Sequence, residues 1–449
     1  MTVADFRTVC MEKFDLHAHE LNARAKTNIE RYRKGDRTLR ILDKDGKPVV
    51  GARVEIRQQS HDFKYGANIF LLDEFQQEET NLRYRENFAK FFNLATVPFF
   101  WAELEPEEGK PRYAKNSPKI YRRPAPDLCV EYCEQNGILP KLHCLFYDKF
   151  LPNWVPKTDS AAMWRLYEKR FAEIAEHYAG KMYEFEVTNE LLLAHGWKTG
   201  NRCSVLSGAR GTAMKMWEMA RRYFPNEKLV INEANYLPDL GTMGYVTPYY
   251  MLLETMLAKG ASIDKIGVQN HIFCGSKGPQ AEQLPNYMKY FDPALLTKGL
   301  SYLEDFGKPL EITEVTIPTF GEGEDAEQLQ ADLLRALYSI WFATPLMETV
   351  AYWNTADGTA WINPMGGSNE NNCRAGLFHN DMTPKLAALE LKRLFEEEWH
   401  TEEGLVTDEN GCVRFRGFYG EYTAEMQGAT LRFGLHKGEP SLSVYQSKI

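Results

Sequence analysis

Short apolar runs alternate with amphipathic stretches through the middle of the chain. The stretches have helical spacing: apolar residues from Trp164 to Tyr178 recur at intervals of three and four, and residues 327–342 and 384–395 behave similarly. The apolar runs number eight: residues 63–70, 92–99, 139–146, 183–190, 228–235, 265–273, 309–317 and 348–355. Near-continuous apolar runs are typical of parallel strands covered on both faces. Eight such strands, each followed by a helix, predict an α/β fold, a (β/α)8 TIM barrel.

The two ends of the chain have a different character. Residues 1–35 are charged and helical in pattern. Two β-rich runs around a DKDGKP turn follow and predict a β-hairpin over residues 36–62. Residues 399–449 contain further short alternating runs with glycine-containing turns. We expect the hairpin and the C-terminal strands to form a small accessory β-sandwich, with the barrel domain over residues 63–398.

Composition and charge narrow the class of protein. Apolar residues make up 44% of the chain, and the formal net charge is −9 with basic residues dispersed, so neither extensive disorder nor a nucleic-acid partner is expected. No segment approaches the roughly 18 apolar residues of a membrane helix, and the N-terminus has no secretion-signal pattern. Eight scattered cysteines without a C-x-x-C motif fit free thiols. We expect a cytoplasmic protein without membrane contact; the oligomeric state stays open.

Polar and aromatic side chains end most of the predicted strands. Parallel barrel strands all end on one rim, so groups far apart in the sequence converge there. The carboxyl groups of Glu190 and Glu314 would face one another across the mouth of the barrel from strands four and seven. The residues at these strand ends are His143, Asn189, Glu190, Asn232, Asn235, Gln269, His271, Glu314 and Trp353.

Two facing carboxyl groups suit the cleavage of a glycosidic bond. One donates a proton to the leaving oxygen, and the other attacks or assists the anomeric carbon. Taken singly, a Glu at a strand end is more often a surface group, and a His or Trp is more often part of a core. The combination of these residues favours a catalytic site over surface or core roles, because a purely structural barrel has little reason to end five strands with amides, imidazoles and carboxylates.

The strand-end motifs resemble those of glycoside hydrolase family ten, the xylanase family. VTNE resembles its strand-four acid/base motif, ITEV its strand-seven nucleophile motif and VQNHIF its strand-six Gln-x-His. LHCLFYDKFLPNWV is similar to the segment after strand three, WNTADGTAW to the strand-eight segment and WAELEPEEGK to the stretch after strand two. The six motifs occur in the family's order between residues 63 and 395.

The resemblance implies a role for each matching residue. Glu190 would be the acid/base and Glu314 the nucleophile of a retaining double displacement, with carboxyl groups about 5 to 5.5 Å apart. Asn189 would bind the sugar 2-hydroxyl, and His271 would contact Glu314. Further residues expected to contact the substrate are His143, Gln269, Trp353, Trp361, Tyr147, Trp101 and Asn235. The implied protein is a retaining β-glycosidase for β-linked xylosides or related short oligosaccharides, without a metal or cofactor.

The chain departs from the family on the side that binds the non-reducing sugars. Family members usually carry a Glu-Asn pair and a Lys before the strand-two Trp, whereas Thr96, Val97 and Phe100 stand there in this chain. Tyr147 replaces a Trp, and Thr316 replaces the Asp two residues beyond the nucleophile. We therefore expect a shortened or apolar glycone side, which favours a terminal sugar, a short oligosaccharide or a decorated glycoside. An endo-1,4-β-xylanase acting on longer xylan is the alternative.

Two other classes of protein account for part of the sequence. His17 and His19 form an H-x-H pattern that binds metal in some barrel amidohydrolases, but they lie in a charged helical stretch that would point the imidazoles apart. The second class is a barrel that binds saccharides without catalysis. The presence of both Glu190 and Glu314 argues against it.

Overall fold

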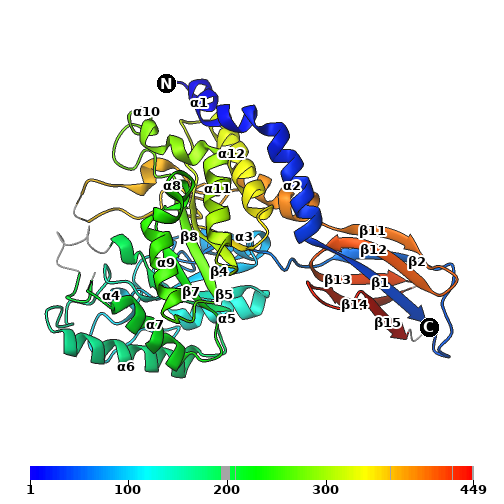
Figure 1. Ribbon diagram of the computed structural model, residues 1–449, viewed down its shortest axis with the longest axis horizontal. Helices are drawn as coiled ribbons and strands as arrows, with labels where there is room; N and C mark the ends of the chain where they lie inside the picture. Colours follow the sequence, from blue (N-terminus) through cyan, green and yellow to red (C-terminus); the bar gives the residue numbers. More distant parts are fainter. Residues whose placement is uncertain (194–202, 208, 365, 427, 447–449) are drawn as a thin grey trace. The chain divides into compact units, whose positions relative to one another are not determined.

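The computed structural model describes residues 1–193, 203–207, 209–364, 366–426 and 428–446 (Figure 1). The chain divides into two compact units. The first unit contains most of the barrel and comprises residues 1–16, 65–333 and 349–388. The second unit contains the accessory sheets and comprises residues 17–64, 334–348 and 389–449.

Eight strands close into a barrel in the order β10-β3-β4-β5-β6-β7-β8-β9. Each strand overlaps one of the eight predicted apolar runs, so the predicted (β/α)8 architecture is confirmed. Strands such as β8 and β9 are buried along their whole length, which explains their continuous apolar character. The strands are β3 (Lys64–Asn68), β4 (Leu94–Pro98), β5 (Leu139–Phe146), β6 (Glu184–Asn189), β7 (Leu229–Glu233), β8 (Lys265–His271), β9 (Leu310–Thr316) and β10 (Met347–Tyr352).

Helices connect the barrel strands (Figure 1). Helix α6 shows how the sequence specifies one of them. Asp159 caps its start by accepting a hydrogen bond from the Ala162 backbone N–H at 3.0 Å, and Tyr167, Phe171 and Tyr178 on the predicted apolar face are buried. The α-helices are α1 (Val3–Leu16), α2 (Ala18–Tyr32), α3 (Glu78–Phe91), α4 (Trp101–Leu104), α5 (Pro126–Asn136), α6 (Ser160–Tyr178), α7 (Thr212–Tyr223), α8 (Leu237–Met243), α9 (Pro248–Ala258), α10 (Gln280–Gln283), α11 (Pro293–Glu304), α12 (Glu324–Phe342) and α13 (Leu386–Arg393). Helices α12 and α13 match the other two predicted helical stretches.

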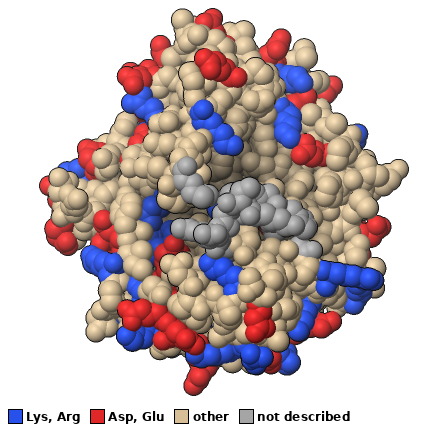
Figure 2. Space-filling view, turned by 90° about the vertical axis from the view of Figure 1, so that its left-hand side faces the viewer, with Lys and Arg blue, Asp and Glu red and all other residues tan. Residues whose placement is uncertain are grey.

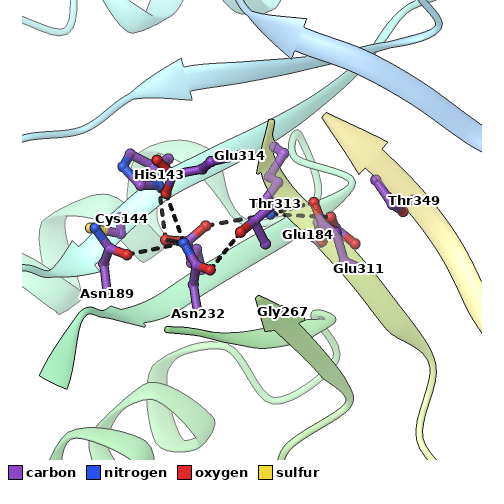
Figure 3. Close-up of polar contacts among 12 residues, drawn as sticks. His143, Cys144, Glu184, Asn189, Asn232, Gly267, Glu311, Thr313, Glu314 and Thr349 are labelled. Atoms are coloured by element: carbon purple, nitrogen blue, oxygen red, sulfur yellow. Dashed lines mark hydrogen bonds and ion pairs between the residues drawn. The ribbon is translucent and has the colours of Figure 1, made fainter. Parts of the chain in front are cut away.

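The interior of the barrel holds a buried cluster of charged side chains, two of which, Glu184 and Glu311, are labelled in Figure 3. Lys141 donates to Glu311 at 2.6 Å and lies 3.3 Å from Glu186. Lys265 donates to Glu184 at 2.7 Å. All five side chains are at most 2% exposed. Burial by itself lowers the pKa of Lys141, but the surrounding carboxylates reverse this effect and raise it, so Lys141 keeps its charge.

A three-stranded and a four-stranded sheet form the accessory β-sandwich, as predicted (Figure 1). The sheets have the orders β12-β1-β15 and β11-β2-β13-β14. Apolar side chains from both sheets, among them Ile41, Ile56, Tyr422 and Phe433, form one core. The strands are β1 (Lys34–Leu42), β2 (Arg53–Gln58), β11 (Glu402–Val406), β12 (Cys412–Phe418), β13 (Gly420–Met426), β14 (Ala429–Leu435) and β15 (Leu442–Gln446).

The predicted hairpin over residues 36–62 is wrong. Strands β1 and β2 lie in different sheets: β1 pairs with β12 and β15, and β2 pairs with β11 and β13. The tight turn is present, because Asp43 Oδ1 accepts a hydrogen bond from the Lys47 backbone N–H. The chain then crosses to the other sheet, so Leu39 and Val54 enter the shared core from two sheets. A hairpin would have placed both on one sheet.

The N-terminal segment is helical, and the cysteines are free thiols. One helical segment was predicted over residues 1–35, and the structure has two helices there, α1 and α2, followed by the start of β1; His17 lies between the helices and His19 is exposed on α2. All eight cysteines are free, and seven of them are buried, as predicted. Within the described ranges, no helix has both the length and the apolarity to cross a bilayer.

Removing one member of the charge cluster should destabilise the barrel. Lys141→Met leaves Glu311 and Glu186 buried without their cation, so we expect the free energy of unfolding to fall by about 3 to 5 kcal/mol in denaturant titrations. Lys169→Met is the matched control, because the Lys169 pair with Glu173 is half exposed and should change stability by less than about 1 kcal/mol. Equal effects of the two substitutions would contradict the prediction.

Candidate active site

A cavity of about 410 Å³ lies at the C-terminal ends of the barrel strands. Ten of the eleven predicted site residues line it: His143, Tyr147, Asn189, Glu190, Asn235, Gln269, His271, Glu314, Trp353 and Trp361.

On the face of the molecule shown in Figure 2, the Lys and Arg side chains of the described residues are interspersed with Asp and Glu. This distribution gives no broad basic patch there for a nucleic acid.

The backbone turns sharply where β6 ends. Asn189 is the last residue of the strand, and Glu190 has a φ of +53°, in the left-handed region that non-glycine residues rarely occupy. Neighbouring strand residues stabilise this turn: the Glu190 N–H donates to the Asn232 carbonyl at 3.1 Å, and the Leu192 N–H donates to Glu233 Oε1 at 3.1 Å. The unfavourable conformation therefore occurs at a residue whose side chain lines the cavity.

The Glu190 carboxyl group is held by two donors. The Tyr147 hydroxyl donates to Oε2 at 2.5 Å, and the Gln269 amide donates to Oε1 at 3.1 Å. Burial and the Glu190 charge raise the pKa of Tyr147, so its phenol stays protonated and can donate. A Trp, as the family resemblance implies at this position, would have no hydroxyl. The replacement by Tyr147 thus adds a hydrogen bond to Glu190.

The Glu314 carboxyl group is buried and surrounded by nitrogen donors. Asn232 Nδ2 lies 2.9 Å and Gln269 Nε2 lies 3.0 Å from Oε1, while His271 Nε2 lies 3.1 Å from Oε2. Burial raises the pKa of Glu314 to about 8, with the neighbouring carboxylates Glu186 and Glu190 adding to the rise. The hydrogen bonds orient the carboxyl group. Burial favours its protonated form, so the proton is lost only as the pH rises through about 8.

Glu190 and Glu314 share a single donor. The same nitrogen, Gln269 Nε2, lies 3.1 Å from Glu190 Oε1 and 3.0 Å from Glu314 Oε1. Since these two distances add up to 6.1 Å, the two oxygens cannot be further apart than that. The Gln269 amide therefore bridges the two carboxyl groups.

His271 is positioned by Thr316 on the neighbouring strand β9 and by Asn235, two residues beyond the end of β7. Its Nδ1 lies 2.8 Å from Thr316 Oγ1, and the Asn235 amide bonds the His271 backbone in both directions, at 2.8 and 3.0 Å. Burial lowers the pKa of His271 to about 4, so the ring is neutral. A neutral ring carries one N–H, which we assign to Nε2 because Glu314 is the acceptor there, leaving Nδ1 to accept from the Thr316 hydroxyl.

A network of hydrogen bonds links Glu314 to the charged interior of the barrel (Figure 3). The Asn232 amide lies within 3.2 Å of Glu186, 3.0 Å of Asn189 and 2.9 Å of Glu314. Glu186 also pairs with His143 at 2.8 Å. Burial opposes protonation of His143, but Glu186 outweighs it and raises the pKa. The carboxyl pair is therefore supported from below by groups that hydrogen-bond or pair with one another.

Aromatic rings form one wall of the cavity. The Trp353 ring meets the rings of Phe70, His143 and His271 edge-on, with centroids 5.3, 5.2 and 5.9 Å apart. The Lys149 ammonium lies 4.8 Å from the Trp361 ring centroid. The two predicted Trp residues thus line the cavity, and both present flat faces suited to sugar stacking.

Trp101 does not line the cavity, and the prediction that placed it there is wrong. Its side chain is 4% exposed, its indole N–H donates to Glu105 at 2.9 Å, and its ring packs on Trp154 and Tyr167. Helix α4 begins at this residue and turns the ring away from the rim. Trp101 anchors the loop after β4.

The sequence reasoning missed several residues of the site. Asn232 was recognised at a strand end but given no role, although the Asn-Glu order of VINEAN repeats that of VTNE. Arg122, Arg123, Lys149 and Glu370 also line the cavity. They lie in connections without periodicity, so no sequence pattern predicted their position.

One group of metal-ligand types occurs among the described residues: His143, Cys144 and Glu186, all buried. His143 and Glu186 already form a direct ion pair at 2.8 Å. Burial raises the pKa of the Cys144 thiol well above its usual value, which disfavours the thiolate that a metal requires. These residues fit a structural role beside the carboxyl pair better than a metal site.

The barrel and its two facing carboxyl groups have the arrangement of a glycoside hydrolase. The family model of glycosyl hydrolase family 10 matches residues 62–393. The chain therefore belongs to this family, as the resemblance predicted.

Relatives and solved structures agree with this assignment. Endo-1,4-beta-xylanase 2 of Arabidopsis thaliana is 26% identical over 408 residues, which cover 88% of this chain and 32% of that protein. The anti-sigma-I factor RsgI6 of Acetivibrio thermocellus is 25% identical over 402 residues, 89% of this chain and 45% of that protein. The chain thus spans less than half the length of these two relatives. The crystal structure of xylanase 10B from Thermotoga petrophila RKU-1 in complex with xylobiose shares the fold, with a TM-score of 0.58 and 19% identity over 75% of this chain and 95% of that one.

The raised pKa of Glu314 can be observed directly. Because the folded-state pKa is raised to about 8, the proton should be bound below that pH and be lost as the pH rises through it. We expect carbon-13 NMR of labelled Glu carboxyl groups to show a titration near pH 8 that Glu314→Gln removes. Glu176→Gln, on the exposed face of α6, should leave it in place. If the titration near pH 8 is still present in the Glu314→Gln variant, the assignment to Glu314 is wrong.

Proposed function

We propose that this chain is a retaining β-glycosidase that hydrolyses β-linked xylosides or related short oligosaccharides. The observation that carries the proposal is the single Gln269 amide shared by Glu190 and Glu314. It limits the nearest carboxyl oxygens to 6.1 Å, which is compatible with carboxyl groups about 5 to 5.5 Å apart as in retaining enzymes.

The reaction takes two displacements. Glu190 gives its proton to the leaving oxygen while Glu314 attacks the anomeric carbon, which forms a glycosyl-enzyme ester and releases the aglycone. Glu190, now a base, takes a proton from water, and the water oxygen displaces Glu314 from the anomeric carbon. This cycle starts with the proton on Glu190 and with Glu314 ionised; burial raises the pKa of Glu314 to about 8, and the nitrogen donors at its two oxygens favour the ionised form that attacks.

The neighbouring groups support these roles. The Asn189 carbonyl oxygen already accepts hydrogen bonds from Asn232 and Gln269, so its NH2 group is the part that can serve a sugar hydroxyl. The neutral His271 and the Asn232 amide give Glu314 hydrogen bonds without adding a positive charge. Hydrogen bonds to the charged form favour the carboxylate that attacks.

The glycone side supports short or decorated substrates. Thr96 and Val97 are buried inside the barrel, so neither offers a polar group to a second sugar. Phe100 lines the cavity and packs with Phe70 and Phe150 in an apolar cluster. The alternative is an endo-1,4-β-xylanase, which the names of the Arabidopsis thaliana relatives favour.

Substitution of the two carboxyl residues tests the chemistry. Glu314→Ala should abolish turnover of every aryl β-glycoside, because no nucleophile remains. Glu190→Ala should lower kcat by roughly 10²- to 10⁴-fold on substrates with a poor leaving group and much less on a dinitrophenyl glycoside, whose departure needs no proton. Glu176→Ala on the exposed face of α6 is the control. A parent protein without turnover on any glycoside would point to a binding barrel instead.

The cutting mode is tested with oligosaccharides. We expect aryl xylosides and xylobiosides to be cleaved, and reduced xylohexaose to be shortened slowly from one end, because the buried Thr96 and Val97 offer no polar contact to a second sugar. The products are separated by chromatography at early times. Rapid internal cleavage of reduced xylohexaose would establish the endo-acting alternative.

A further inference from the structure

Two consecutive arginines, Arg122 and Arg123, line the active-site cavity from the connection between α4 and α5. Both are buried: Arg122 is 7% exposed, and the Arg123 side chain is 12% exposed. Arg122 has a φ of +62°, in the left-handed region. The connection thus adopts an unfavourable backbone conformation at the point where two adjacent guanidinium groups reach the cavity.

The contacts of these guanidinium groups leave their charges without a close counter-ion. Arg122 donates to the Thr359 carbonyl and, at 3.4 Å, to Asn354 Oδ1. Arg123 Nη1 donates to the Arg122 carbonyl at 2.8 Å, and its ion pair with Glu103 is long, 3.9 Å from Nε. Within the described ranges, Nε of each arginine has no hydrogen-bond partner, and Arg122 takes part in no ion pair.

Buried charges in proteins are as a rule paired or bound to a ligand. The Lys141 cluster inside this barrel follows the rule closely, whereas no ion pair of Arg122 is found among the described residues and Arg123 has only the long one with Glu103. Burial lowers the pKa of both arginines, that of Arg123 to about 10, so they remain charged at neutral pH. Two desolvated cations with unused donors indicate a place for an anion.

The arginines lie on the glycone side of the cavity. The Arg123 guanidinium lies over the Phe100 ring, 4.2 Å from its centroid, and the Phe100 and His143 rings are 5.1 Å apart. Phe100 stands where the sequence comparison with the family expects a lysine. The positive charge that is missing at position 100, just beyond β4, is therefore supplied by another segment of the chain, and Phe100 alone separates that segment from His143 at the expected cleavage site.

We propose that Arg122 and Arg123 form a subsite for an anionic substituent of the sugar, either the carboxylate of a uronic acid or a sulfate ester. The inference rests on the proposed function. It specifies which decorated glycosides the proposed hydrolase would accept. A guanidinium group fits both anions, because its parallel N–H groups match two oxygens. The cavity as a whole supports an anion, since the described residues lining it include four Lys or Arg and three Glu side chains.

Substrates that differ only in charge provide the test. Four xylo-oligosaccharides of equal chain length are compared: one undecorated, one with a glucuronosyl substituent, the methyl ester of that acid, and one with a sulfate ester. We expect kcat/KM for the acid or the sulfated substrate to exceed that for the neutral ester roughly tenfold to a hundredfold. Whichever anion gives the larger preference identifies the substituent.

Variants assign the preference to the arginines. Arg123→Met should reduce the acid-to-ester or sulfate-to-ester ratio to near one. Arg222→Met, on the exposed side of α7 in a pair with Glu168, is the matched control and should keep the ratio. Equal kcat/KM for charged and neutral substrates in the parent would overturn the proposal, as would a preference that survives Arg123→Met. The parent ratio needs no variant, so it decides the question even if Arg123→Met does not fold.

Binding measurements separate this inference from the proposed function. Calorimetry with the same four oligosaccharides reports affinity without turnover. If none is hydrolysed but an acidic one binds tenfold or more tightly than its ester, the hydrolase proposal fails and the anion subsite stands. If the undecorated and acidic substrates are hydrolysed equally well and bind equally, the subsite fails and the hydrolase proposal stands.

Discussion

The interior of the barrel buries ion pairs, and the position of the carboxyl groups at its rim depends on how these charges satisfy one another. Lys141 compensates Glu186 from below, and Glu186 in turn pairs with His143 and accepts from Asn232. The Asn232 amide then reaches Glu314. Each group is held by partners that have no freedom to move away, since an unpaired charge at this depth is costly. The carboxyl groups at the rim are therefore held in place by the charged side chains in the barrel interior.

This support explains how the chain tolerates its departures from the family pattern. With Thr316 instead of an Asp, His271 has no carboxylate behind it and stays neutral, so it orients Glu314 by a hydrogen bond alone. Tyr147 in place of a Trp compensates on the other side by bonding Glu190. The Gln269 amide lies between both carboxyl groups and donates a hydrogen bond to each.

The eight barrel strands and eight of the eleven predicted site residues could be derived from the sequence, because buried parallel strands leave continuous apolar runs and their ends share one rim. Tyr147 and Trp361 were predicted through the resemblance to the family. The hairpin was mispredicted because a turn motif reports a change of direction but not which sheet receives the next strand. Trp101 was misplaced because the start of α4, at the residue itself, rotates its ring into the core. Arg122 and Arg123 were missed because their position depends on a loop conformation that leaves no periodic pattern.

The accessory sandwich takes its strands from both sides of the barrel in the chain: Lys34 of β1 lies opposite Phe418 of β12, and Glu55 of β2 lies opposite Glu425 of β13. During synthesis on the ribosome, β1 and β2 therefore emerge before the barrel, and they have no partner strands until the whole barrel has been translated. Their open edges are exposed to other nascent chains for that time. Chaperone occupancy of these two early strands would then govern the yield of correctly assembled protein.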